Sequence, residues 1–566
     1  FALDRSGRLL AADKAGVAEL DFVFDRLRLK SETIKYLPSN DTFTTQYDYT
    51  VSSSGATRKL TYPGGRQVLE TYDKRLRQVE IDGDAAGSQA VGTTWAYDDA
   101  NRRTGYDRAN GVAATIGLDV ANRITEILCV DGKTVPTTLV DVSCGYDPHG
   151  NRLWTENGVK ADRGESYTYD NRHRLTSFRR GTMQWSGSPA VPSIPTALAH
   201  NDIVGTQSWS LDRRGNWTTF TEQIGIPLVT TTQNRAVANG ANEYGQFTIN
   251  GVPGSTPSHD AKGNLTNDPY APNYGAASPG QNYAYDAENR LLLVTTDDVV
   301  PLPLLEIVYD AIGRRIASTD YTGASLPCSG GPQTVITRHL YAGIQTIEEH
   351  VWCNVEPEGW DLVREFVWGP RFPEPVAMID HSEAGDEPDP GTPEILHYTH
   401  DVLGSAILLT DASAIPVERY TYDPYGKTAI ENGAWSAVRT ESFYGNPFDW
   451  TGQRFDAGTA LYHFLFRNYS PNLGRWLQRD PAHYIDGVNL YEFVRSAPTN
   501  HVDPHGLELT SLHDPRSVSL LIDMYGIEET ALLLKLSVEE VAALAAAAKA
   551  AEAAAEIGRA SCRERV

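Results

Sequence analysis

The stretch YDPHGNRL, residues 146–153, is one copy of a short unit that recurs along most of this 566-residue chain. The unit is Tyr-Asp, two variable residues, Gly or Asn, and then commonly Arg or Asn and an apolar residue. Most neighbouring copies lie roughly 20–30 residues apart, the spacing of a repeat array, and the gaps at 175–211 and 217–259 are longer. The other copies are YDKRLRQ (72–78), YDDANRR (97–103), LDVANRI (118–124), YDNRHRL (169–175), LDRRGNW (211–217), HDAKGNL (259–265), YDAENRLL (285–292), YDAIGRRI (309–316) and YDPYGK (422–427).

Each copy has the features of a β-hairpin. The residues before the Tyr alternate in polarity, as in SYTYD (166–170) and RYTYD (419–423), which indicates a strand. The Asp side chain can accept hydrogen bonds from backbone N–H groups two or three residues further on, and Gly or Asn tolerates a positive φ. The Arg and the apolar residue then begin the next strand.

A single hairpin cannot bury its apolar face, so successive copies are expected to pair side by side into one continuous sheet. Such a long sheet twists and tends to curl or close. Scattered hairpins in unrelated β domains are the alternative, and ten copies of one unit argue against it. The composition agrees, because 28 Tyr, 48 Gly and 32 Pro favour strands and tight turns.

Charge and cysteine content exclude some classes of protein. The net charge of −24 argues against a nucleic-acid-binding surface, because phosphate contacts need basic groups. No stretch reaches the roughly 18–20 apolar residues of a membrane-spanning helix. Cys129, Cys144, Cys328 and Cys353 lack metal-ligand spacing, and they are compatible with two disulfides or with four buried thiols.

The Tyr-Asp unit resembles the YD repeat of RHS (rearrangement hotspot) proteins. HYTHDVLGSAILLTDASAIPVERYTYDPYGK (397–427) is similar to the start of the RHS repeat-associated core. NPFDWTGQRFDAGTALYHFLFRNYSPNLGRWLQRDP (446–481) and NLYEFVRSAPTNHVDPHGL (489–507) resemble its most diagnostic part. The resemblance implies a mostly β fold, in which YD-repeat hairpins wind into a spiral sheet. This sheet forms a hollow β-cage, capped by the core, around a variable C-terminal effector that is often a toxin.

The resemblance divides the chain into four segments. Residues 1–396 are expected to form the YD-repeat cage, which we interpret as truncated at its N-terminus because FALDRSGRLL reads as mid-repeat. Residues 397–507 correspond to the core, and 508–555 to the start of a helical effector region. Ser537 and Glu540 form a capping box there, and the lack of a basic face disfavours DNA binding. Residues 556–566 match the translation of a sequencing adapter and are interpreted as an artefact.

The family's core can cleave itself with two aspartates, and the matching positions are Asp480 in LQRDP and Asp503 in VDPHG. Two carboxyl groups about 3 Å apart cannot both ionise, so one can act as base and the other as acid. Arg479 matches a basic position that could hold the pair. The resemblance places the cut between Leu507 and Glu508.

The alternative is that Asp503 only closes a turn, since YDPHG at 146–150 uses the same tetrapeptide in a repeat. Two features favour a boundary between the shell and the effector at Leu507. The repeats stop there, and Ala, Leu and Glu dominate the sequence that follows. Asp486 could be a third carboxylate or a turn residue, and His483 is expected to be exposed. No His pair, phosphate loop or nucleophile elbow suggests a metal or a cofactor.

We therefore expect the encapsulating shell of a secreted or cell-surface toxin, a self-cleaving aspartyl enzyme acting once in cis. Its cargo would be its own C-terminal effector, and a secretion or injection apparatus and an immunity protein would be further partners. The alternative is a non-enzymatic cell-surface protein for adhesion or carbohydrate binding.

Overall fold

The computed structural model describes residues 1–507 apart from residues 5–7, 27, 38, 85–90, 187–190, 194–202, 225–228, 238, 273–278, 324–333, 354–358, 383–392 and 485–486. The expected helical region at 508–555, the adapter-like residues 556–566, Glu508, Asp486 and Cys328 lie outside the described residues. Within the described part, the helical elements are the short 3-10 turns η1 (Ala161–Arg163), η2 (Trp450–Gly452) and η3 (Val494–Ser496). None of the described helices is long and apolar enough to cross a membrane.

The first sheet has 21 strands, and each pairs antiparallel with its neighbours in sequence. Its strands are β1 (Ala2–Leu3), β2 (Leu9–Lys14), β3 (Ala18–Asp25), β4 (Arg28–Tyr36), β5 (Thr42–Ser52), β6 (Gly55–Thr61), β7 (Gln67–Tyr72), β8 (Gln78–Asp82), β9 (Gly92–Tyr97), β10 (Arg103–Arg108), β11 (Ala113–Leu118), β12 (Ile124–Val130), β13 (Thr138–Tyr146), β14 (Arg152–Asn157), β15 (Gly164–Tyr169), β16 (Leu175–Gly181), β19 (Ile203–Leu211), β20 (Trp217–Ile224), β21 (Val229–Val237), β22 (Tyr244–Ile249) and β23 (Val252–Pro253). A separate hairpin, β17 (Gln184–Ser186) and β18 (Val191–Ser193), lies between β16 and β19 in sequence.

The second sheet has 15 strands and the third has four. The second consists of β24 (Ser258–His259), β25 (Leu265–Asp268), β26 (Gln281–Tyr285), β27 (Leu291–Thr296), β28 (Pro303–Tyr309), β29 (Arg315–Asp320), β30 (Val335–Ala342), β31 (Gln345–Cys353), β32 (Gly359–Trp368), β33 (Pro375–Asp380), β34 (Glu394–His400), β35 (Ala406–Thr410), β36 (Pro416–Tyr422), β37 (Thr428–Asn432) and β38 (Val438–Arg439). The third consists of β39 (Arg454–Asp456), β40 (Leu461–His463), β41 (Asn468–Ser470) and β42 (Arg475–Trp476). The expected mostly β fold of side-by-side hairpins is confirmed.

The Tyr-Asp units form the turns between these strands in the way that the sequence predicts. In the turn after β11, the Asp119 Oδ1 atom accepts from the N–H groups of Ala121 and Arg123, both at 2.9 Å. The Asp119 Oδ2 atom accepts from Arg123 Nε at 2.7 Å. Asn122 has a φ of 65°, the left-handed conformation that Asn and Gly tolerate best. One carboxylate therefore fixes both the turn and the following Arg.

The same Arg also reaches the next turn of the array. Arg123 Nη1 donates to the carbonyl of Asp147 at 2.8 Å, and the Tyr146 hydroxyl donates back to the carbonyl of Ile124 at 2.8 Å. Equivalent arginine contacts join Arg77 to Asp98, Arg102 to Asp119, Arg174 to Asp212 and Arg290 to Asp310. The unit is therefore both a turn and a link to its neighbour.

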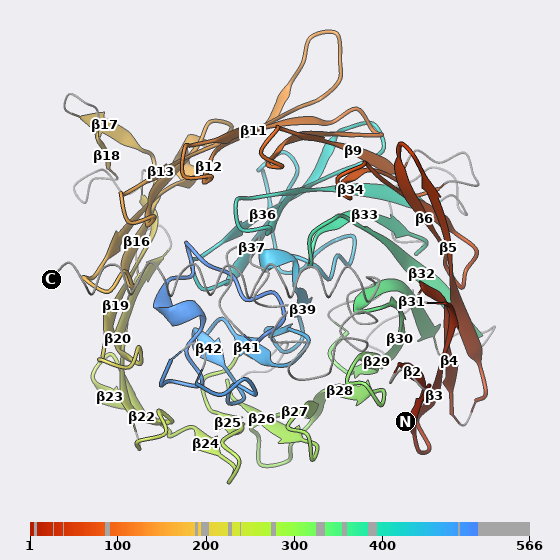
Figure 1. Cartoon of the computed structure of the whole chain (residues 1–566). Helices are drawn as coiled ribbons and strands as arrows, with labels where there is room; N and C mark the ends of the chain where they lie inside the picture. Colours follow the sequence, from red (N-terminus) through yellow and green to blue (C-terminus); the bar gives the residue numbers. More distant parts are fainter. Residues whose placement is uncertain are drawn as a thin grey trace, which may run out of the picture.

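The sheets follow a spiral course (Figure 1). The first sheet runs around a ring, and the second continues it and then passes inside it, so that β30–β37 lie within the strands of the N-terminal part. Contacts between the layers are direct. The Tyr62 hydroxyl donates to the carbonyl of Phe366 at 2.9 Å, and Arg108 donates to that of Val376 at 3.3 Å. The largest apolar cluster fills the space between the two layers.

Residues after β38 leave the wall and lie within the ring in Figure 1. The third sheet carries a buried aromatic cluster that includes Trp450, Tyr469 and Trp476. It is joined to the wall by backbone contacts, such as the N–H of Leu265 donating to the carbonyl of Leu477 at 2.9 Å. This inner segment holds all the described residues of the predicted cleavage site.

Candidate functional site

The hairpin β41–β42 positions the first aspartate. Tyr469 pairs with Trp476 across it, and the ladder continues where the N–H of Leu477 donates to the carbonyl of Asn468 at 2.9 Å. The side chain of Gln478 then accepts from the Asn468 N–H at 2.9 Å. Because Arg467 precedes one strand and Asp480 follows the other, the ladder brings these two residues together.

Asp480 and Asp503 meet on the guanidinium of Arg467. Arg467 Nη1 lies 3.1 Å from Asp480 Oδ2, and Arg467 Nη2 lies 3.1 Å from Asp503 Oδ2. The third nitrogen, Nε, donates to the carbonyl of Gly506 at 2.6 Å. The guanidinium also lies 4.1 Å from the centre of the Trp476 ring. All three charged residues are buried, with 6% or less of their surface exposed.

The turn that contains Asp503 reaches the predicted cleavage site. Asp503 Oδ1 accepts from the N–H groups of Gly506 at 2.8 Å and Leu507 at 2.9 Å. Leu507 is itself buried, with 2% exposed. The carboxyl group therefore lies within one residue of the Leu507–Glu508 bond, although Glu508 is outside the described residues.

The two Asp-Pro-His-Gly copies make different turns. In the repeat copy, Asp147 Oδ1 accepts from the N–H groups of His149 and Asn151, while Oδ2 accepts from the Asn151 side chain at 2.6 Å. In the last copy, Asp503 caps N–H groups three and four residues ahead, and its Oδ2 atom goes to Arg467. The side chain of Asp147 thus bonds within its own turn, whereas the side chain of Asp503 also joins a buried charge cluster.

Arg479, predicted to hold the aspartate pair, faces another way. Its Nη2 atom donates to Glu243 at 2.8 Å and its Nε atom to the Tyr491 hydroxyl at 3.1 Å, and its side chain is 35% exposed. Successive side chains leave this non-helical segment in different directions, so Arg479 faces the repeat wall while Asp480 faces the interior. The place predicted for Arg479 beside the pair is occupied by Arg467.

Sequence reasoning did not identify Arg467, although one signal was present. It is the only charged residue in FLFRNYS (464–470), a run of aromatic and apolar residues. A buried Arg requires anionic or carbonyl partners, because an unpaired charge in the interior is very unfavourable. A search for carboxylates near a buried Arg in the same segment would have connected Arg467 to Asp480 and Asp503.

The histidines near the junction are neutral or exposed. His505 stacks on Phe372 with ring centres 5.1 Å apart, and burial lowers its pKa to about 4. Its Nε2 atom has no hydrogen-bond partner among the described residues. His483, expected to be exposed, is exposed. His505 therefore adds no positive charge to the aspartate pair at neutral pH.

The described part of the chain offers little support for other site chemistry. Cys129 and Cys144 are free and buried. Cys353 ends β31, but its side chain, like all of Cys328, lies outside what the structure describes. Within the described ranges, no group of three or more His, Cys, Asp or Glu side chains could hold a metal ion.

Comparison with known proteins places this architecture among bacterial toxins. Toxin subunit YenC1 of Yersinia entomophaga is 27% identical over 462 residues, covering 74% of this chain and 42% of YenC1. Double-stranded DNA deaminase toxin A of Burkholderia cenocepacia strain H111 is 27% identical over 394 residues, covering 66% of this chain and 25% of that toxin. The chain thus spans well under half of either relative. No protein-family model matches it.

The fold has a solved counterpart in a subunit of the Photorhabdus luminescens Tc holotoxin pore. The TM-score is 0.68 at 21% identity, and the match covers 88% of this chain and 24% of the other. The shared features are antiparallel sheets wound from Tyr-Asp hairpins. In sequence and in fold, the chain thus resembles toxin subunits of the RHS/YD-repeat type.

Proposed function

We propose that this chain is the shell of a toxin and that it encloses its own C-terminal segment. In this proposal, residues 1–396 form the wall of a hollow β-cage, 397–507 close one end of it, and the chain from 508 onwards is cargo. The relatives with toxin names and the spiral of sheets support this function. They favour it over the alternative of a protein for adhesion or carbohydrate binding.

We further propose that the chain cleaves itself between Leu507 and Glu508. The observation that carries this proposal is the convergence of Asp480 and Asp503 on Arg467, next to Leu507. One ionised carboxyl would remove a proton from the attacking water, and the other, protonated, would donate a hydrogen bond to the Leu507 carbonyl. Arg467 would stabilise the ionised partner and, through Gly506, hold the substrate strand beside it.

The direct test is the intact mass of the purified chain. The wild type is expected to yield a fragment that ends at Leu507, still bound to the remainder if the shell stays closed. Asp480→Asn and Asp503→Asn should each leave the chain at full mass, because Asn can neither act as base nor carry the acidic proton. Asn keeps the size and the hydrogen-bond acceptor, so circular dichroism should remain that of a β protein.

Asp147→Asn is a matched control, because it makes the same change in the other Asp-Pro-His-Gly turn. This variant should cleave like the wild type. A wild-type chain that stays at full mass would mean that the buried cluster is structural. Equal cleavage by the wild type and both Asn variants of the site would mean that other residues perform the reaction.

The proposed function carries expectations about place and partners. A toxin shell acts outside the cell that makes it, so we propose that the protein is secreted or held at the cell surface. A secretion or injection apparatus and an immunity protein against the cargo would be its partners. Co-purification of a full-length chain with proteins encoded beside it would test this, and recovery of the shell alone would count against stable partners.

A further inference from the structure

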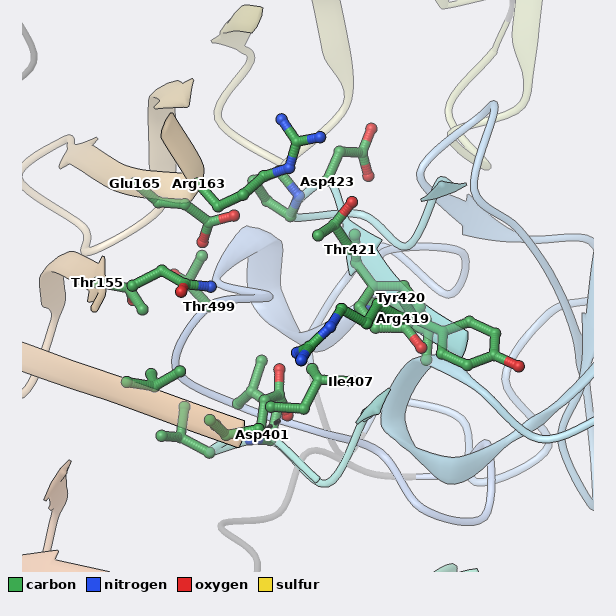
Figure 2. A pocket seen from close by; sticks show the side chains of 18 of the residues that line it. Thr155, Arg163, Glu165, Asp401, Ile407, Arg419, Tyr420, Thr421, Asp423 and Thr499 are labelled. Atoms are coloured by element: carbon green, nitrogen blue, oxygen red, sulfur yellow. Dashed lines mark hydrogen bonds between the residues drawn. The ribbon is translucent and has the colours of Figure 1, made fainter. Parts of the chain in front are cut away.

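A partly open cavity lies between the repeat wall and the start of the core, away from the aspartate pair. Its volume is about 110 Å³, and its lining comes from β13–β15 on one side and from β35, β36 and Thr499 on the other. A single water needs roughly 10–15 Å³ of such space. The cavity is therefore large enough for a group of several atoms. Figure 2 shows Arg163 and Glu165 entering it from the wall, and Arg419 from β36.

Two buried arginines of this cavity form no close ion pair with any described carboxylate, although Asp401 acts on Arg152 and Glu431 on Arg419 electrostatically. Arg152 and Arg419 are 5% and 6% exposed. Arg419 donates to the carbonyls of Gly433 at 2.8 Å and Leu139 at 3.0 Å. The buried Nε atom of Arg152 has no hydrogen-bond partner among the described residues. Within the described ranges, neither guanidinium forms an ion pair, an unfavourable state for a buried cation.

The carboxylates that line the cavity are already engaged elsewhere. Glu165 pairs with Arg180 at 2.5 Å. Asp423 accepts from Gln207 at 2.8 Å and from its own turn. Asp401 accepts from two N–H groups of its own turn, and burial raises its pKa, which weakens it further as a counter-ion. Among the described residues, none of these three carboxylates therefore forms a close ion pair with Arg152 or Arg419.

Both guanidinium groups are held in place by aromatic rings. Arg419 lies 4.9 Å from the centre of the Trp435 ring, and Arg152 lies 5.4 Å from that of Tyr167. Arg163, the third arginine of the cavity, is paired with Glu431 at 2.8 Å and so has its own counter-ion. A planar guanidinium fixed by a ring presents its N–H groups in the forked geometry that recognises oxyanions.

We propose that this cavity binds one small oxyanion, a phosphate or carboxylate group, through Arg152 and Arg419. The threonines at 155, 421 and 499 line the same space and offer hydroxyl groups to such a ligand. Because one arginine belongs to the repeat wall and the other to the core, the bound anion would join the two parts. The ligand should therefore stabilise the folded chain.

The test is titration of the whole chain with inorganic phosphate, and separately with acetate, against chloride at equal ionic strength. Calorimetry should show one saturable site for at least one of these anions, and the same anion should raise the temperature of thermal unfolding. Arg152→Met and Arg419→Met should each weaken binding about tenfold or more. Arg152→Lys keeps the positive charge but lacks the paired N–H groups of a guanidinium. This variant should bind the anion more tightly than Arg152→Met does.

Arg108→Met is the matched control, because Arg108 is equally buried between the layers but does not line this cavity. It should bind the anion like the wild type, even if it unfolds at a lower temperature. The proposal is overturned if the wild type binds neither anion saturably. It is also overturned if Arg152→Met and Arg419→Met bind as tightly as Arg108→Met does.

Discussion

At the scale of single residues, the partner of an aspartate decides what an Asp-Pro-His-Gly turn does. Asp147 has both side-chain oxygens satisfied within its own turn. Asp503 shares Arg467 with Asp480, so its turn depends on two distant segments. The local sequence predicts the turn in both cases. The local sequence does not predict that Arg467 binds Asp503, because the β41–β42 hairpin is what brings Arg467 to the aspartates.

Replacing Arg467 tests how far the buried cluster depends on this one cation. Arg467→Met leaves two buried carboxyl groups without the guanidinium they share, and removing one partner of a buried ion pair costs roughly 3–5 kcal/mol. We expect the free energy of unfolding at pH 7 to fall by about that amount. Arg479→Met removes a partly exposed contact to Glu243 and should cost about 1 kcal/mol or less. Urea midpoints of the two variants, compared with the wild type, measure both. Equal costs would mean that Arg467 is not the centre of the cluster.

Glu492 should make the stability of the chain depend on pH. Burial raises the pKa of its carboxyl to about 7, and the Ser496 hydroxyl donates to it at 2.6 Å. The folded state holds this proton more tightly than the unfolded chain does. The resulting stability is complete below about pH 4.5 and is lost as the pH rises through about 7.

Glu492→Gln keeps an acceptor for Ser496 and removes the charge. We expect the variant to match the wild type near pH 4 and to exceed it by up to roughly 3 kcal/mol at pH 8.5. Urea unfolding of both proteins across this range measures the difference, so contributions from other groups cancel. A constant difference between the two proteins from pH 4 to 8.5 would contradict this assignment.

At the scale of elements, the turns of the repeat were predictable and the links between turns were not. The Tyr-Asp unit predicts an Asp that caps N–H groups and a later residue with positive φ. Asp119 and Asp147 cap such groups, and Asn122 and Gly150 have the positive φ. The contact from Arg123 to the carbonyl of Asp147 depends on how one hairpin stacks on the next. The pattern of one unit contains no information on that stacking.

Leu76 occupies the position of the turn that favours Gly or Asn, with a φ of 59° and 59% of its surface exposed. This conformation costs an ordinary L-residue roughly 1–2 kcal/mol. Leu76→Asn should therefore raise the free energy of unfolding by about 1 kcal/mol, measured by urea denaturation. The reciprocal change, Asn101→Leu in the next turn, should lower it by a similar amount. If both changes are neutral, the backbone at this position is not strained.

At the scale of the whole molecule, the sequence indicated a long, curled sheet but not which strands would overlap. The Tyr36 hydroxyl donates to the carbonyl of His339, and the Thr45 hydroxyl to that of Tyr341, across about three hundred residues of chain. Overlap of the two layers depends on the curvature of the sheet, which adds small rotations over many strands. The spacing of the repeats alone does not determine this total curvature.

The overlap predicts where the folded chain is most protected. Strand β33 is paired on both edges, and all six of its residues are buried because it lies beneath the outer layer. Strand β21 is also paired on both edges, but apart from Arg235, which contacts the inner segment, its residues are partly or fully exposed. Since both strands have the same hydrogen-bonding status, a difference in amide exchange between them reports the covering layer. Hydrogen–deuterium exchange with peptide mass analysis should show peptides from 375–380 exchanging only through global unfolding, while those from 229–237 exchange far earlier. If the two exchanged alike, the layers would open as one unit, and the overlap would contribute nothing to local stability.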